Sequence, residues 1–202
     1  MTRIETLAEG VTDLAAGKAG EYLVCADLIL RGHVAFPSEQ GLPYDIVAEI
    51  YGRLYKIQVK TTRGPRPVPQ RKEHIAAYLF HVGRCGKGGV KSYGADDVDF
   101  FALVALDTKC VSYLAACNVK RTMIFRSPAL RGKYKNEIDI ANAKSVHEQT
   151  ALGLSGLSIA AATGLDKSTV SRIRKRPAPL IGNHSPYLDE FTFERAFDVV
   201  PS

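Results

Sequence analysis

Residues 43–60, PYDIVAEIYGRLYKIQVK, form the stretch that decides the fold. β-Branched and aromatic residues alternate with polar ones on both sides of a glycine, which predicts two β-strands joined by a tight turn at Tyr51, Gly52 and Arg53. Side chains along a strand point to alternate faces of a sheet. The order of residues in this hairpin therefore determines which side chains share a face.

The alternation brings three polar side chains of the hairpin to one face. On the second strand Gln58 and Lys60 point away from the core, and on the first strand Asp45 has the same orientation. A carboxylate can then lie beside an amide oxygen and an ammonium, the groups that a hard divalent cation and a phosphate require. The alternative is an ordinary half-exposed hairpin with polar residues outside. The residues predicted on the opposite face are Tyr55, Ile57 and Val59 on the second strand, and Tyr44, Ile46, Ala48 and Ile50 on the first.

A helix is predicted before the hairpin, from Thr12 or Asp13 to about Arg31, with Gly32 as its C-cap. Glu21 lies on the apolar side of this helix, and a glutamate that faces inward needs a partner such as a metal or a lysine. The alternative is a glutamate at the edge of the apolar stripe that reaches solvent. The stripe consists of Leu14, Cys25 and Leu28, widened by Leu23, Ala26 and Leu30.

An aspartate that follows Pro43 at the start of a strand, the motif Gln58-Val59-Lys60 on the next strand and a carboxylate on the preceding helix together resemble the PD-(D/E)xK nuclease superfamily. Gln58 stands where an acidic residue is usual. The sequence SEQGLPYD followed by QVKT looks most like the branch that contains group I intron-encoded homing endonucleases, in which glutamine also replaces the acid. The resemblance covers roughly residues 15–115.

This resemblance implies an α/β fold with a restriction-endonuclease-like core, a mixed β-sheet flanked by helices, and metal-dependent hydrolysis of DNA phosphodiester bonds. The metal would be Mg²⁺, with Mn²⁺ as a substitute, and its implied ligands are Asp45, Glu21, the side-chain oxygen of Gln58 and the backbone carbonyl of Val59. Lys60 would orient or activate the attacking water and stabilise the charge that develops on phosphorus. Because Gln58 removes one negative charge, weaker metal binding is expected.

The chain has 202 residues, enough for one sizeable core or a core with a small appended domain. Its hydrophobic content of 46% and charged content of 24% are ordinary for a soluble globular protein. No apolar run approaches the ~20 residues that span a bilayer, and the polar, acidic N-terminus is no signal peptide, so a cytoplasmic or nucleoid-associated protein is expected. The four cysteines form no C-x-x-C pair, which favours free thiols over disulfides or zinc ligands.

Basic and acidic residues are unevenly distributed along the chain. Residues 1–50 contain three basic and eight acidic residues, whereas residues 60–91 contain eight basic residues and one acid. Residues 118–135 contain six basic residues and no acid. Basic segments that follow an acidic site region fit a polyanion held over a metal centre, although a solvated basic surface is the alternative. The candidate DNA contacts in the first basic segment are Arg63, Arg66, Lys87 and Lys91.

The remaining core strands are predicted from short apolar runs. Residues 33–37 form the first strand, residues 100–106 a strongly apolar strand in the sheet interior, and residues 111–115 its neighbour. Glycines and basic residues at 83–94 predict a flexible loop that could close on a phosphate backbone. Residues 118–142 have no clear period and are predicted as mixed helix and loop.

A second module is predicted at residues 157–176, where apolar and small residues have the spacing of a helix-turn-helix. Asp166 is a good N-cap for the second helix. The motif resembles that of DNA-binding proteins, in which such a helix enters the major groove, and the alternative is a pair of packed helices with a basic end. The residues expected on the outward face of the second helix are Lys167, Ser168, Ser171, Arg172 and Lys175.

These features predict a nuclease core at residues 1–140, a helix-turn-helix module at 145–180 and a C-terminal tail at 181–202 that packs back or forms a subunit contact. The predicted function is that of a site-specific endonuclease acting on double-stranded DNA as a homodimer or homotetramer. Two alternatives are open: a structure-specific nuclease similar to Holliday junction resolvases, and a DNA-binding regulator on a nuclease-like scaffold that no longer cuts. The apolar residues of the tail are Phe191, Phe193 and Phe197.

Overall fold

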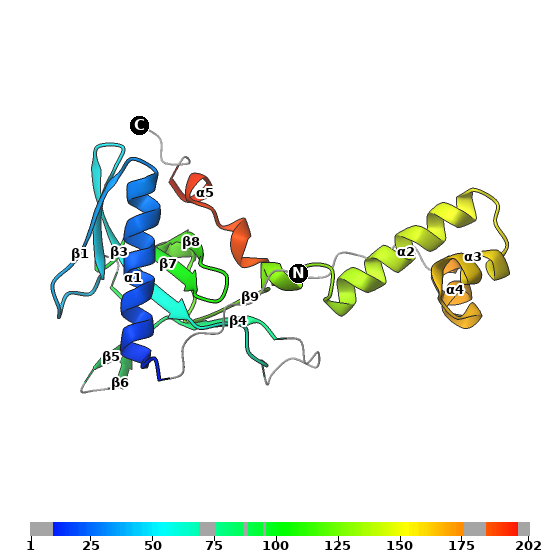
Figure 1. The fold of residues 1–202 in the computed structure, drawn as a ribbon, viewed down its shortest axis with the longest axis horizontal. Helices are drawn as coiled ribbons and strands as arrows, with labels where there is room; N and C mark the ends of the chain where they lie inside the picture. Colours follow the sequence, from blue (N-terminus) through cyan, green and yellow to red (C-terminus); the bar gives the residue numbers. More distant parts are fainter. Residues whose placement is uncertain (1–9, 69–75, 87–88, 95, 176–184, 198–202) are drawn as a thin grey trace. The chain divides into compact units, whose positions relative to one another are not determined.

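The computed structural model describes residues 10–68, 76–86, 89–94, 96–175 and 185–197. The chain divides into two compact units (Figure 1). The first unit is formed by Met1–Ala129 together with Ser185–Ser202, and the second by Leu130–His184. Each unit has its own core.

The first unit is built on a five-stranded mixed sheet. All neighbouring strands are antiparallel except β3 and β7, which are parallel. A mixed sheet flanked by helices confirms the α/β class predicted from the sequence. In their order across the sheet, the strands are β1 (Val34–Pro37), β2 (Ile46–Ile50), β3 (Arg53–Thr62), β7 (Phe100–Ala105) and β8 (Cys110–Ala115).

The hairpin of β2 and β3 has a two-residue turn. Tyr51 and Gly52 both have positive φ, 51° and 76°, as a type I′ turn requires. Ile50 pairs directly with Arg53. Arg53 therefore begins the second strand, and the prediction that it belongs to the turn was wrong. The reason is geometric, because the type I′ turn matches the twist of the two strands with only two residues between them.

Helix α1 (Asp13–Leu30) covers one face of the sheet (Figure 1). Thr12 caps it by accepting a hydrogen bond from the backbone of Ala15, and Gly32 follows its last turn with φ of 86°. Leu14, predicted in the apolar stripe, is instead 84% exposed because it lies on the first turn of the helix, ahead of the residues of this stripe that are buried. The buried residues of the helix are Ala16, Gly20, Val24, Cys25 and Leu28.

Gly20 is the point of closest approach between α1 and the sheet. A Cβ atom at this position would lie 2.0 Å from the side-chain oxygen of Thr61 on β3, so only glycine allows this contact. Gly17 has open space around it and does not determine the packing. The close approach at Gly20 brings the next residue of α1, Glu21, to the edge of β3.

A second core covers the opposite face of β7. It contains Tyr78 and Phe80 from β4 (Tyr78–His81) and Phe125 from β9 (Thr122–Phe125), packed on Phe101 and Leu103. Because apolar layers cover both faces, every residue of β7 is buried, as the unbroken apolar run FFALVA predicts. Single turns of 3₁₀-helix, η1 (Ala116–Asn118) and η2 (Pro128–Leu130), flank β9.

Two segments differ from the sequence-based predictions. The glycine-rich segment at 83–94 contains a hairpin of β5 (Arg84–Gly86) and β6 (Gly89–Lys91) rather than a loop alone. The segment at 118–142 contains β9 and the first part of helix α2 (Lys135–Ala151). The strands β5, β6 and β9 were missed because they are too short to show a period, whereas helix within residues 118–142 was predicted without bounds because α2 buries only Ala143 and Val146.

The C-terminal segment of the first unit returns to the sheet. It consists of η3 (Leu188–Glu190) and α5 (Phe193–Phe197), whose two terminal phenylalanines are buried in the same core as α1. Arg31 at the end of α1 forms an ion pair with Glu194. Within the described residues, Cys25, Cys110 and Cys117 are free thiols.

The second unit is helical and has a small core of Val146, Ile159 and Val170. Helices α3 (Gly156–Thr163) and α4 (Lys167–Arg174) are joined at Gly164, whose φ of 69° ends α3. Asp166 caps α4 by accepting a hydrogen bond of 2.8 Å from the backbone of Thr169. Hydrogen bonds from Ser168 and Thr169 lower the pKa of Asp166, which fits a carboxylate at a helix N-terminus. In the part of the chain that the structure describes, no helix is long and apolar enough to cross a membrane.

Candidate active site

Three polar groups converge where β2 begins beside β3. The carboxylate of Asp45 accepts a hydrogen bond of 2.9 Å from the backbone N–H of Val59 and another from the side-chain amide of Gln58. The same amide nitrogen also donates to the carbonyl of Val59, at 3.2 Å. The carboxylate, the amide and the carbonyl therefore surround one small region, as the alternation of the hairpin predicted for Asp45 and Gln58.

The backbone on both sides of Asp45 fixes this carboxylate. Its N–H donates to Ile57 on β3 at 3.0 Å, and its carbonyl accepts from Ser38 after β1 at 2.8 Å. These backbone hydrogen bonds extend the pairing of β2 with β1 and with β3 by one residue beyond β2. Asp45 is thus held in register with β3 although it lies just outside the regular strand.

Gln58 is only 8% exposed, so its amide needs internal partners. It is buried because its register partner on β7 is Phe101, which belongs to the second core. The hydrogen bonds to Asp45 and Val59 satisfy both amide protons. A buried amide beside a carboxylate is a more constrained arrangement than the half-exposed hairpin considered as the alternative.

Burial raises the pKa of Asp45, which the N–H of Val59 partly opposes. The negative charge of Glu21 raises this pKa further, whereas Lys60 and Lys18 lower it. A partly buried carboxylate whose pKa is raised by burial and by a second negative charge is poised to bind a cation. Glu21 lines the same groove as Val59 and Lys60 of β3.

Glu21 itself has a lysine partner. Its carboxylate is 2.7 Å from the ammonium of Lys18, one turn earlier on α1, and its side chain is 19% exposed. The sequence predicted that a metal or a lysine would satisfy Glu21, and in this structure a lysine does. The hydrogen bond to Glu21 raises the pKa of Lys18.

The ammonium of Lys60 is held from outside the hairpin. It donates a hydrogen bond of 3.1 Å to the carbonyl of Gly83, after β4, and lies 5.5 Å from the centre of the Tyr93 ring. Neither Gly83 nor Tyr93 was identified from the sequence, because no local pattern links them to Lys60. Lys18 could have been found, since it lies three residues before Glu21 on the same helix.

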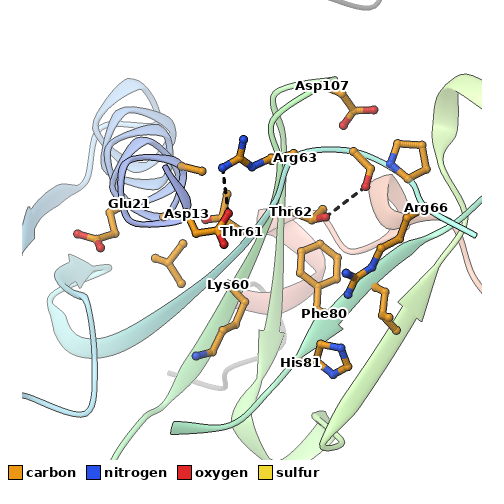
Figure 2. Close-up of a pocket in the computed structure, with 16 residues that line it drawn as sticks. Asp13, Glu21, Lys60, Thr61, Thr62, Arg63, Arg66, Phe80, His81 and Asp107 are labelled. Carbon is orange, nitrogen blue, oxygen red and sulfur yellow. Dashed lines mark hydrogen bonds and ion pairs between the residues drawn. The ribbon is translucent and has the colours of Figure 1, made fainter. Parts of the chain in front are cut away.

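Glu21 and Lys60 line a groove of about 850 Å³. Figure 2 shows its labelled walls, with Glu21 on α1, Lys60 and Thr61 on β3, and Phe80 and His81 on β4. The groove continues past the end of β3, where it is lined by Arg63 and Arg66. Asp13, Glu21 and Asp107 line the same groove, so Lys60, Arg63 and Arg66 offer separate contacts to phosphates rather than a uniformly basic surface.

The predicted DNA contacts fall into separate groups. Arg63 and Arg66 line the groove, and Arg63 is bonded to Asp13 at 2.9 Å. Lys91 is exposed on β6, and Lys87 lies outside the described residues. The remaining residues all belong to the second unit, where they are exposed around α4: Lys167, Ser168, Ser171, Arg172 and Lys175.

The residues present fit a hard divalent cation. Among the described residues, no group of three or more His, Cys, Asp or Glu side chains could hold a metal, so a cation at Asp45 would also need neutral oxygens. The carbonyl of Val59 is one, and the amide oxygen of Gln58 is another, because turning the amide end for end exchanges its nitrogen and oxygen. Carboxylate, amide and carbonyl oxygens are the ligands that Mg²⁺ and Ca²⁺ accept.

A mixed sheet flanked by helices is the fold of PD-(D/E)XK nucleases, and here it carries the candidate residues Asp45 and Lys60 on adjacent strands. The model of the PD-(D/E)XK endonuclease family matches residues 13–149, and the chain belongs to this family. Nucleases of this family typically use divalent metal ions.

The chain is similar in part to solved structures. The structure of a bacterial homing endonuclease, I-Ssp6803I, aligns with 57% of this chain and 75% of that chain, with 15% sequence identity and a TM-score of 0.43. A comparison with curated proteins gave no match.

Proposed function

We propose that this protein is a metal-dependent DNA endonuclease whose catalytic centre is formed by Asp45, Gln58, Lys60 and Glu21. The convergence of the Asp45 carboxylate, the Gln58 amide and the Val59 carbonyl carries the proposal. These groups meet in a chain of an endonuclease family, and Val59 also lines the groove that contains Glu21, Lys60 and two arginines. The substrate class follows from the groove and the family.

Each residue has a defined role in this proposal. Asp45, Gln58 and the carbonyl of Val59 hold Mg²⁺ or Mn²⁺, with Glu21 as a further ligand after it leaves Lys18. When bound, such a cation supplies a water of lowered pKa and stabilises negative charge on the phosphate. Lys60 orients the attacking water and stabilises the charge on phosphorus through its ammonium.

The second unit supplies DNA recognition in this proposal, and the enzyme is site-specific. Helix α4 begins at a well-formed cap and exposes a polar face beside a hollow of about 500 Å³ lined by Ser168, Ser171, Arg172 and Lys175. Exposed basic and hydroxyl side chains along one short helix suit contacts with base edges and phosphates in the major groove.

Double-strand cleavage would require more than one copy of the chain. One catalytic centre cuts one strand, so a homodimer or homotetramer that places two centres on opposite strands is part of the proposal.

The rival function, a DNA-binding regulator that does not cut, is favoured by one observation. The amide nitrogen of Gln58, rather than its oxygen, faces Asp45 and Val59.

Incubation of the protein with plasmid DNA tests the catalytic proposal. We expect cleavage with Mg²⁺ or Mn²⁺, none with EDTA, and binding without cleavage in Ca²⁺. Asp45→Ala should abolish cleavage because it removes the charged ligand that lies beside Gln58 and Val59. Glu49→Ala is the matched control, since Glu49 is an exposed acid on the same strand and face. Cleavage by Asp45→Ala at the parent rate would show that the site has been assigned to the wrong residue.

Arg172→Ala tests the recognition role of α4. Loss of one base contact should weaken binding to the target by ~1–3 kcal/mol and relax specificity at one position. The rate of hydrolysis of bound DNA should change little, because Arg172 belongs to a different unit from Lys60. Binding should be measured at one fixed salt concentration, with Lys144→Ala on α2 as the control for a lost surface charge. If Arg172→Ala binds every DNA as the parent does, α3 and α4 are only packed helices.

A further inference from the structure

We propose that Tyr93 is a positioning residue for Lys60 and that its aromatic ring keeps the lysine ammonium at the catalytic centre. This inference rests on the proposed nuclease function. It adds a residue from a different part of the chain to the Asp45 site. Tyr93 acts through Lys60 and does not touch the reacting phosphate.

The contact geometry supports this role. The ammonium of Lys60 lies 5.5 Å from the centre of the Tyr93 ring, and it donates one hydrogen bond to the carbonyl of Gly83. An ammonium is attracted to the electron-rich face of an aromatic ring at this distance. The ring and the carbonyl therefore restrain the end of the Lys60 side chain from the two ends of the segment that contains β5 and β6.

Tyr93 is itself fixed by the sheet. Its ring packs edge-to-face on Phe101 of β7, with 5.2 Å between ring centres and 83° between ring planes. Phe101 is the register partner of Gln58, so the aromatic pair lies beside the amide of the metal site. The position of the ring is thus tied to the same strands that carry the proposed ligands.

The backbone that follows Tyr93 is also anchored. Asp97 accepts a hydrogen bond of 2.7 Å from the N–H of Gly94, which closes a turn directly after Tyr93. Two residues later, Asp99 exchanges hydrogen bonds with the backbone of Lys56, at 2.7 and 2.9 Å. This segment is therefore attached to β3 four residues before Lys60.

A lysine in a catalytic centre benefits from such support. Its four-carbon stem has many rotamers. A guanidinium forms hydrogen bonds in a fixed, forked geometry, but an ammonium does not. A small displacement of a catalytic group lowers the rate of a reaction strongly, even when the substrate still binds. Tyr93 restricts the stem without removing the positive charge of the ammonium.

The test compares Tyr93→Leu, Tyr93→Met and Tyr93→Phe with the parent in single-turnover cleavage of saturating DNA with Mg²⁺. The two non-aromatic variants should cut about tenfold more slowly, with DNA affinity within about twofold of the parent. Tyr93→Phe should restore the parent rate because it retains the ring. Tyr22→Leu is the matched control, since Tyr22 makes a similar contact of 5.6 Å with Lys18 but lies 59% exposed on α1.

An NMR measurement separates positioning from general damage to the fold. The ring current of Tyr93 should shift the ε-methylene protons of Lys60 upfield in the parent and in Tyr93→Phe, but not in the other two variants. Methionine fills the space against Phe101 without an aromatic face, so Tyr93→Met serves if Tyr93→Leu unfolds.

Three outcomes overturn the inference while the nuclease function stands. In the first, Tyr93→Leu and Tyr93→Met cut DNA at the parent rate. In the second, Tyr93→Phe cuts as slowly as both, and in the third the variants lose DNA affinity but no cleavage rate. A parent that cuts no DNA removes the proposed function and this inference together.

Discussion

Lys60→Ala should reduce the rate of DNA hydrolysis by about 10²–10³-fold while the variant still binds DNA, since this is the usual cost of removing one preorganised donor from a transition state. The ammonium lies on the same face of the sheet as Asp45 and Gln58, where it lowers the pKa of Asp45. Alanine at this position leaves the metal ligands in place. The loss should therefore fall on the chemical step rather than on binding.

The measurement is single-turnover cleavage together with binding at several salt concentrations. Removing one phosphate-facing cation should reduce the salt slope of binding by at most ~1, without abolishing it. Arg53→Ala is the matched control, because Arg53 is an exposed cation at the other end of β3. If Lys60→Ala cuts at the parent rate, the catalytic assignment fails and the DNA-binding regulator becomes the better account.

The part of the site that lies on one hairpin could be predicted from the sequence. Asp45, Gln58 and Lys60 share a face because strand alternation depends only on local order. The turn at Tyr51 and Gly52 then sets the register that brings the two strands together. The burial of β7 was equally clear from its unbroken apolar run.

The parts that the sequence did not predict depend on contacts between distant segments. β4 pairs with β9 across more than forty residues, and neither strand is long enough to show alternation. The support of Lys60 by Gly83 and Tyr93 arises only when β4 and β7 take their places beside β3. Leu14 was misplaced because a helical period predicts a face but not where the neighbouring sheet ends.

Gln58→Glu should make the metal-free protein less stable than the parent. Bound metal should then stabilise the variant more than it stabilises the parent. In the metal-free structure the Gln58 amide donates hydrogen bonds to Asp45 and Val59 at a site that is 8% exposed. A carboxylate of the same size cannot donate these bonds and adds a negative charge beside Asp45. We expect a loss of about 2–4 kcal/mol in the free energy of unfolding near neutral pH without metal.

The same change should strengthen metal binding. An additional charged oxygen ligand raises the affinity for Mg²⁺, by about tenfold or more, which corresponds to at least ~1.4 kcal/mol. Added Mg²⁺ should therefore recover much of the lost stability. The natural glutamine then reflects a balance, in which a stable metal-free site is gained at the expense of metal affinity.

The pH dependence of this variant follows from the pKa of Asp45. Burial already raises this pKa, so the folded state holds the proton more tightly than the unfolded state does. The resulting stabilisation is fully present below the pKa that Asp45 has in the unfolded chain. It is lost as the pH rises through the pKa of Asp45 in the folded protein. A second carboxylate raises the folded pKa further, so the metal-free variant should lose stability over a wider pH range than the parent.

Thermal unfolding with EDTA and with increasing Mg²⁺, at several pH values, checks both effects, and titration calorimetry gives the affinity. Gln40→Glu is the control, because it introduces the same charge at an exposed position in the loop before Asp45. The control should unfold as the parent does in EDTA and gain no affinity. Equal stability and equal Mg²⁺ affinity in Gln58→Glu and the parent would place the metal away from Gln58. A stability loss in EDTA that Mg²⁺ does not reverse would leave Gln58 as a structural partner of Asp45 rather than a ligand.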